Sequence, residues 1–125
     1  DLSVMAMFKD NHLAALGGEG LLGDAVRAAR AAGVPVEIEV DRIEQLDRIL
    51  ALAPDRVLVD NMTPDQVREA VERASGSGCY IEASGGITLG TVREYASTGV
   101  DGISVGSLTH SAPAADISLD WEEPC

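Results

Sequence analysis

The sequence predicts an α/β fold, namely the C-terminal part of a TIM-like (β/α) barrel with five to six parallel strands and intervening helices. Strand and helix patterns alternate at a spacing of roughly 20–25 residues, which is typical of βαβ units. The chain is 46% hydrophobic but only 3% aromatic, so its core is aliphatic, as in parallel sheets covered on both faces. Two glycine-containing loops stand late in the chain, where barrels place a phosphate site.

The length of 125 residues limits this prediction to part of a barrel. A complete barrel has eight strands and about 250 residues, so we expect a single partial α/β-barrel domain over residues 1–125. A free-standing open sheet of the doubly wound type is the alternative, and it fits the length better. It fits the late glycine loops less well, because such folds usually place their glycine loop after the first strand.

The first strand–helix unit opens the chain. A short apolar run predicts a strand at 4–8. A helix is predicted over 20–32, because apolar residues recur there on one face at helical spacing, and Gly33 ends it. That face comprises Leu21, Leu22, Ala25, Val26 and Ala29.

The second unit pairs a strand at 36–40 with a helix over 43–52, whose expected N-cap is Asp41. The third strand is expected at 56–59, and the helix after it runs to about residue 74. That helix has a sequence-encoded start: Thr63 is the N-cap, Pro64 takes the first helical position and Gln66 the third. The remaining elements are strands at 79–82 and 102–105, a helix over 88–97 capped by Thr88, and a short closing strand or extended tail at 116–121.

Composition excludes several classes of function. The formal charge of −12 comes from nine Lys or Arg against 21 Asp or Glu. This argues against nucleic-acid binding, which depends on cationic contacts to phosphates. No apolar run approaches the length of a membrane span, and the first residues carry no signal-peptide pattern. Cys79 and Cys125 do not make a disulfide framework, which favours a reducing compartment. We therefore expect a cytoplasmic protein, and the charge and the lack of an apolar span lead us to expect no binding to nucleic acid or membrane.

Two glutamates share one face of the second strand. Side chains alternate along a strand, so Glu37 and Glu39 lie opposite the apolar residues of 36–40. We expect both glutamates to point into the barrel, since the outward face must pack on helices. A solvated antiparallel strand is the alternative. Inward carboxylates need a cation, a metal or ligand hydroxyls to offset their burial.

Charged residues end three of the strands. Lys9 ends the first, Asp60 the third and Glu82 the fourth, at the edge where barrel enzymes build their sites. Lys9 is the only lysine among nine cationic residues, which favours a specific role, with Schiff-base formation as one alternative. For His12 and His110 the alternative to a site role is a capping or surface residue. The ligand spacing of a zinc site is absent.

Two loops combine glycine with a small hydroxyl residue. Ser84, Gly85 and Gly86 follow the fourth strand, and Gly106 and Ser107 follow the fifth. Glycine lets a ligand approach the backbone closely, and the turn or helix start that follows leaves N–H groups to bind an anion. The pair of loops therefore predicts a site for a phosphate monoester. Tight strand–helix turns without a ligand are the alternative.

Taken together, these motifs resemble one known family. In order they are KDNH at 9–12, EIEV at 37–40, LVDNM at 58–62, EASGGIT at 82–88 and GVDGISVGSLTHS at 99–111. Over essentially its whole length, the chain resembles the C-terminal barrel of the quinolinate phosphoribosyltransferase family (nicotinate-nucleotide pyrophosphorylase, carboxylating). The resemblance implies a transferase of NAD biosynthesis. It would convert quinolinate and phosphoribosyl pyrophosphate to nicotinate mononucleotide, pyrophosphate and CO2 with Mg2+, as a homodimer or higher homo-oligomer.

The resemblance also implies roles for single residues. Lys9 would contact the anionic substrates, and Glu39 and Asp60 would hold the ribose hydroxyls and Mg2+; these three are the expected catalytic residues. His12, Glu37 and Glu82 are further candidates. The residues implied to cradle the 5′-phosphate are Ser84, Gly85, Gly86, Gly106 and Ser107.

The family also has an N-terminal α/β domain and earlier barrel strands, which carry an arginine and lysine cluster for the carboxylates of quinolinate. We expect these parts to be absent from residues 1–125, which leaves two further readings of the function. One is a non-catalytic phosphate-binding fragment or oligomeric module of the barrel. The other is a different barrel enzyme, such as a lysine-dependent aldolase or a phosphosugar isomerase. Asp10 beside Lys9 disfavours the aldolase, which usually needs a hydrophobic pocket around its lysine.

Overall fold

A parallel sheet organises the chain in the computed structural model, which describes residues 4–9 and 19–106. Its five strands pair in sequence order, β1-β2-β3-β4-β5, and every pairing is parallel. The strands are β1 (Ala6–Lys9), β2 (Val36–Val40), β3 (Arg56–Asp60), β4 (Tyr80–Ser84) and β5 (Gly102–Ile103). The helices are α2 (Glu19–Ala31), the 3-10 turn η1 (Ile43–Gln45), α3 (Leu46–Leu50), α4 (Pro64–Ala74) and α5 (Val92–Ala96).

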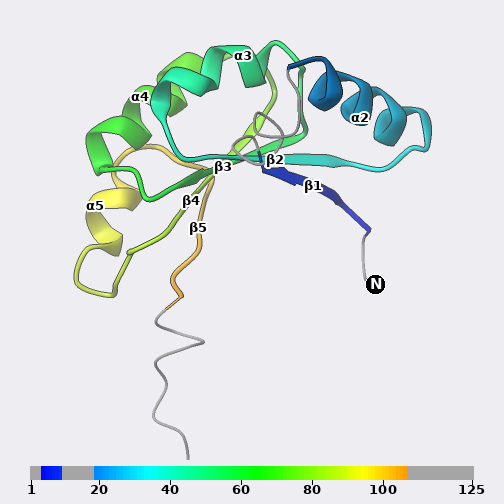
Figure 1. Cartoon of the computed structure of the whole chain (residues 1–125). Coiled ribbons are helices and arrows are strands. Elements are labelled where there is room, and N and C mark those ends of the chain that lie inside the picture. The colour runs from blue at the N-terminus through cyan, green and yellow to red at the C-terminus, as the bar shows by residue number, and fades with distance from the viewer. Residues whose placement is uncertain (1–3, 10–18, 107–125) are drawn as a thin grey trace, which may run out of the picture.

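The order of the strands decides between the two predicted folds. A doubly wound sheet reverses its strand order at a switch point and carries helices on both faces. Here the order never reverses, and the α-helices lie along one side of a curved sheet (Figure 1). Right-handed crossovers between successive neighbouring strands give this arrangement. The five parallel strands of a partial barrel are therefore confirmed, and the open doubly wound sheet is wrong. The closing strand expected at 116–121 lies outside the described residues.

The core lies between the sheet and the helices. Alternate residues of β2 and β3 are fully buried there, and they meet the apolar stripes of α2, α3 and α4. Burial of each such side chain stabilises the folded state by about 1.5–3 kcal/mol. Within the part of the chain that the structure describes, no helix is long and apolar enough to cross a membrane. The largest fully buried side chains are Ile38, Leu46, Ile49, Ile81, Val26, Val36, Val40, Val57, Val59 and Val67.

Two helix starts differ from the prediction. The expected helix over 43–52 is divided into η1 and α3, and Asp41 is not its N-cap. Instead the Gln45 side chain reaches back and accepts from the backbone N–H groups of Asp41 (3.1 Å) and Arg42 (2.9 Å). Thr88 does not cap a helix either, because α5 begins only at Val92, after Thr91. Gly90 is a poor helix former and favours the turn that delays this start.

The start of α4 is the one that the sequence pattern predicts correctly. Thr63 Oγ1 accepts from the N–H of Gln66 (3.3 Å), while the Gln66 side chain accepts from the N–H of Thr63 (2.9 Å). This reciprocal capping box satisfies two N–H groups that a helix terminus otherwise leaves unpaired. In α2, by contrast, Leu22 and Val26 are buried as expected but Leu21 is exposed. Leu21 precedes Leu22 by one residue and lies at the edge of the apolar stripe, where it faces solvent.

Two aspartates at strand starts fix the register of the sheet. The N–H of Asp55 donates to Val36 O (3.0 Å), and the Asp55 carboxylate accepts from Val36 N (2.8 Å). Asp101 makes the same pair of bonds with Ile81, at 3.0 and 2.8 Å. Each aspartate precedes its own strand and binds the neighbouring one. The side chain thereby replaces a ladder carbonyl at the point where regular pairing begins.

Asp101→Ala should lower the free energy of unfolding by about 1–3 kcal/mol, because it leaves the N–H of Ile81 without its acceptor in a part-buried position. Asp101→Asn retains an acceptor oxygen and should recover part of the loss. Urea unfolding of the chain measures both variants. Asp24→Ala is the matched control, since its exposed ion pair with Arg27 on α2 should contribute no more than about 1 kcal/mol. Equal losses in Asp101→Ala and Asp24→Ala would contradict the register role.

Candidate functional site

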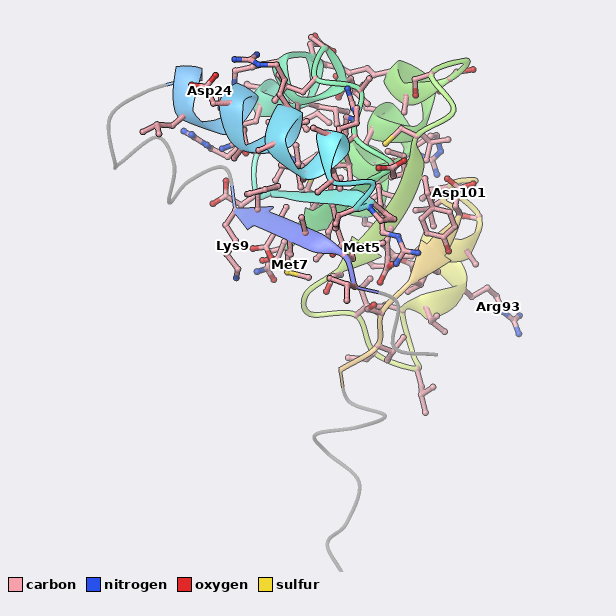
Figure 2. All side chains as sticks on the ribbon, turned by 90° about the vertical axis from the view of Figure 1, so that its right-hand side faces the viewer. Met5, Met7, Lys9, Asp24, Arg93 and Asp101 are labelled. Atoms are coloured by element: carbon pink, nitrogen blue, oxygen red, sulfur yellow. The ribbon has the colours of Figure 1, made fainter. Side chains whose placement is uncertain are left out.

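The face of the sheet opposite the helices carries the charged residues. Because the strands are in parallel register, these side chains form rows across the sheet. Figure 2 shows Met7 and Lys9 projecting from β1 on the side away from α2. The first row is Met7, Glu37, Arg56 and Tyr80; the second is Lys9, Glu39, Leu58, Glu82 and Gly102; the third is Asp60 and Ser84.

Lys9 and Glu39 form an ion pair in the second row. Lys9 Nζ lies 3.4 Å from Glu39 Oε2, with the lysine side chain 46% exposed and the glutamate side chain 15% exposed. Each residue lies at or next to the carboxyl end of its strand, β1 or β2. The structure thus brings together two of the three predicted catalytic residues, and the lysine head remains accessible to an anionic ligand.

Arg56 joins the two remaining glutamates of this face, and the sequence reasoning gave it no site role. Its Nε lies 3.5 Å from Glu37 Oε2, and its Nη1 donates to Glu82 Oε2 at 3.1 Å. The guanidinium also stacks 4.6 Å from the centre of the Tyr80 ring. Ser104 Oγ donates to the other oxygen of Glu82. The sequence did offer a signal: alternate residues of a strand share a face, so Arg56 lies on the same face of β3 as Asp60.

Glu37 and Glu39 both lie on the face opposite the helices, as predicted. Glu37 is almost fully buried. Burial raises the pKa of Glu37 above its ordinary value, Arg56 lowers it, and the neighbouring charges of Glu82 and Glu39 raise it further. The Arg56 ion pair is therefore what offsets the burial of this carboxylate. Arg56 is thus the cation bound to Glu37 and Glu82, whereas Lys9 is the cation paired with Glu39.

Asp60 lies beside the predicted phosphate loop. Its strand partner is Ser84, and the loop turns immediately after it through Gly85 (φ +82°) and Gly86 (φ +65°). Asn61 Nδ2 donates to Asp60 Oδ2 at 3.2 Å. A carboxylate and a turn with glycine backbone thus meet at the carboxyl ends of β3 and β4. Gly106 follows β5 at the same edge. His12, Ser107 and His110 lie outside the described residues.

The donor set suits a divalent cation only in combination with a ligand. Among the described residues, no group of three or more His, Cys, Asp or Glu side chains lies close enough to hold a metal ion. Glu39 and Asp60 instead offer one carboxylate each from neighbouring strands. Mg2+ commonly binds through one or two carboxylates together with substrate phosphates and water, and these two residues fit that pattern.

A cavity of about 240 Å3 lies at the opposite edge of the sheet and has no catalytic character. Its lining includes Val71, Cys79 and Asp101. Burial, together with the charges of Asp55 and Asp101, raises the pKa of the Cys79 thiol to about 11. A thiol is a nucleophile only as thiolate, and this shift disfavours the thiolate form of Cys79 at neutral pH. The candidate site is therefore the carboxyl edge with Lys9, Glu39, Asp60 and the loop after β4.

Comparisons with known proteins agree on one family. Residues 1–120 match the family model described as "Quinolinate phosphoribosyl transferase, C-terminal domain". The chain is 46% identical over 119 residues to the nicotinate-nucleotide pyrophosphorylase [carboxylating] of Mycobacterium leprae, covering 92% of this chain and 41% of that protein. It is 39% identical over 124 residues to the Homo sapiens protein of the same name, covering 95% and 41%. The chain spans about two-fifths of the length of these curated relatives.

Solved structures give the same result. A nicotinate-nucleotide pyrophosphorylase from Ehrlichia chaffeensis superposes with a TM-score of 0.76 at 34% identity, over 89% of this chain and 40% of that one. NadC from Streptococcus pyogenes superposes with a TM-score of 0.73 at 35% identity, over 97% and 42%. At this identity and coverage the likeness includes both the backbone and the sequence.

The Arg56 ion pairs predict a pH dependence of stability. The pKa of folded Glu37 is already raised, so this group favours the folded state at low pH, and its contribution is lost as pH rises from about 4.3 through the raised value. Arg56→Gln removes the cation that lowers the pKa, which widens the window and deepens the loss. Urea unfolding at several pH values should show a steeper fall in stability than in the wild type.

Glu37→Gln combined with Arg56→Gln supplies the control for this experiment. The amide does not titrate, so the additional slope should disappear in the double variant while Glu82 and Glu39 still face the same site. A steeper slope that persists without Glu37 would assign the effect to one of those two carboxylates and would contradict the prediction.

Proposed function

Because the chain belongs to the family of quinolinate phosphoribosyltransferase C-terminal domains, we propose that it carries the phosphoribosyl-binding part of that enzyme's active site. The reaction transfers a phosphoribosyl group from phosphoribosyl pyrophosphate to quinolinate. It yields nicotinate mononucleotide, pyrophosphate and CO2, and it belongs to NAD biosynthesis. The proposal includes Mg2+ as the cofactor, assembly as a homodimer or higher homo-oligomer, and a cytoplasmic location.

One observation supports this proposal above the others. Lys9, Glu39 and Asp60 lie at the carboxyl edge of three successive strands and on one face, next to the loop of Gly85 and Gly86. A cation, two carboxylates and a glycine turn in this order match the parts of a phosphoribosyl pyrophosphate. The turn would hold the 5′-phosphate, the carboxylates the ribose hydroxyls, and the lysine an anionic substrate.

The chemistry needs carboxylates at this place. Departure of pyrophosphate leaves positive charge on the anomeric carbon and ring oxygen, as in the oxocarbenium-like transition state of glycoside hydrolysis. A carboxylate about 4 Å from that charge contributes about 4 kcal/mol at an effective dielectric of 20. Mg2+ held with Glu39 and Asp60 would supply charge neutralisation for the departing pyrophosphate. Lys9, already paired with Glu39, orients that carboxylate.

The second substrate needs more cations than this face provides. Quinolinate carries two carboxylates, whereas among the described residues of this face only Lys9 and Arg56 are cationic, and Arg56 is bound to Glu37 and Glu82. We therefore propose that quinolinate binds mainly through the segments that make up the rest of the relatives' length. The complete site would form between those segments and the edge described here.

The proposal predicts activity in a reconstituted protein, in which this chain replaces the matching segment of the Mycobacterium leprae relative. Release of nicotinate mononucleotide from quinolinate and phosphoribosyl pyrophosphate should be measurable and should require Mg2+. Glu39→Gln with Asp60→Asn should lower kcat by at least about a hundredfold, because two charge-stabilising groups are lost together. Circular dichroism and urea unfolding confirm that the variant is folded.

Calorimetric titration of the 125-residue chain with phosphoribosyl pyrophosphate separates this function from the alternative of a non-catalytic phosphate-binding module. Mg2+-dependent binding that the double variant loses supports the proposed site. If the chain binds phosphoribosyl pyrophosphate equally well without Mg2+ and in the double variant, and the reconstituted protein shows no turnover, the phosphate-binding module is favoured. Trapping of a carbonyl substrate on Lys9 by borohydride would instead indicate an aldolase.

A further inference from the structure

Asn61 adopts a left-handed backbone conformation, which is uncommon for residues other than glycine. Among the described residues, it and Ala53 are the non-glycine residues with positive φ, at 54° and 51°. Asparagine tolerates the left-handed region better than most residues do, but glycine adopts it at no steric cost. Asn61 directly follows Asp60 at the end of β3. Its backbone N–H donates to Ser84 O (3.0 Å), which extends the pairing of β3 with β4 by one residue.

The left-handed turn directs the Asn61 side chain back to its neighbour. Asn61 Nδ2 donates to Asp60 Oδ2 at 3.2 Å. Hydrogen bonds to an ionised carboxylate are stronger than those between neutral groups. A glycine at this position would make the same turn without this bond. The asparagine therefore supplies something that the turn itself does not require, which is a donor for the carboxylate.

Gly85 completes this arrangement from the neighbouring strand end. A Cβ on Gly85 would lie 2.6 Å from Asp60 Oδ1 and 2.6 Å from Asn61 Oδ1, and its φ is +82°. Both distances are too short for a real Cβ contact, so the Asp60 and Asn61 side chains, which occupy the space that the missing Cβ leaves, would have to move aside for any residue other than glycine. Gly86 differs: its Cβ would meet only Asn61 Oδ1, at an ordinary 3.8 Å. Glycine at position 85 therefore suits both the positive φ of the turn and the present position of the Asp60 carboxylate.

We propose that Asn61 is a positioning residue for Asp60, and that Asn61 and Gly85 together set the carboxylate and the loop after β4 as one unit. The inference rests on the proposed function for its catalytic meaning. Displacing Asp60 moves the group assigned to the ribose, and displacing Gly85 moves the turn assigned to the phosphate. Because the Asp60 side chain fills the space that a Cβ on Gly85 would take, a shift at either position disturbs the other.

Asn61→Gly tests the role of the side chain apart from the backbone. Glycine keeps the left-handed turn, so the urea midpoint should be unchanged or raised. In the reconstituted protein, kcat should fall about tenfold, the lower end of the worth of a hydrogen bond to a charged group, while the KM for phosphoribosyl pyrophosphate changes less. In the Asp60→Asn background, the same substitution should produce no further loss, because the two residues act through one group.

Ala53→Gly is the matched control. It relieves the other left-handed non-glycine residue, which lies away from the carboxyl edge, and should raise the urea midpoint with kcat unchanged. If Asn61→Gly behaves like Ala53→Gly, Asn61 serves the turn alone and the inference is overturned. An equal loss in the Asp60→Asn background overturns it as well.

Crystal structures of the variants give a readout that does not depend on turnover. The Asp60 carboxylate should leave its position or occupy several rotamers in Asn61→Gly and in Gly85→Ala, and should stay in place in Gly86→Ala. An unmoved carboxylate in the first two variants refutes the positioning role. If the wild-type reconstituted protein shows no phosphoribosyl transfer, the proposed function fails, while these structures still decide whether Asn61 and Gly85 hold Asp60.

Discussion

The alternation of side chains along parallel strands in sequential order is the constraint on which this structure depends. Every helix returns to the same side of the sheet, so one set of alternate residues must be apolar, as Val36, Ile38 and Val40 are. The other set is excluded from that core. All the charge that the strands carry is consequently collected on one face, and register determines which charges become neighbours. The site therefore lies on the face of the sheet that the helices leave uncovered.

That face is divided into two electrostatic regions. In one region Arg56, at the amino end of β3, binds Glu37 and Glu82 and lies over the Tyr80 ring. This region has a complete set of internal partners and offers little to a ligand. Toward the carboxyl ends, Lys9 with Glu39 and Asp60 stand beside the loop after β4. Buried carboxylates are costly without a cation, and the arginine lets the face carry them close to the functional pair without competing for the lysine.

Much of this could be predicted from the sequence, because it follows from period and local chemistry. The strands, the inward glutamates and the Thr63 capping box depend on neighbours within a few residues. What could not be predicted depends on partners about 20 residues away. Asp55 binds Val36, and Arg56 binds Glu82, through pairing that no local pattern encodes. The two predicted caps, Asp41 and Thr88, were wrong because each α-helix begins later than expected, and the side chains of Gln45 and Thr91 instead reach back to accept from the N–H groups of Asp41, Arg42 and Thr88.

The contact at Gly85 has a consequence for sequence divergence. A side chain at this position conflicts with Asp60 and Asn61 together, so the three positions are not free to vary independently. A lineage that abandons the acid at position 60 removes one of the two clashes, while the positive φ of Gly85 still favours glycine there. A lineage that keeps the acid must keep the glycine, whatever ligand the loop binds. A substitution at 85 would therefore indicate that the turn after β4 and the side chains beside it have been rearranged together.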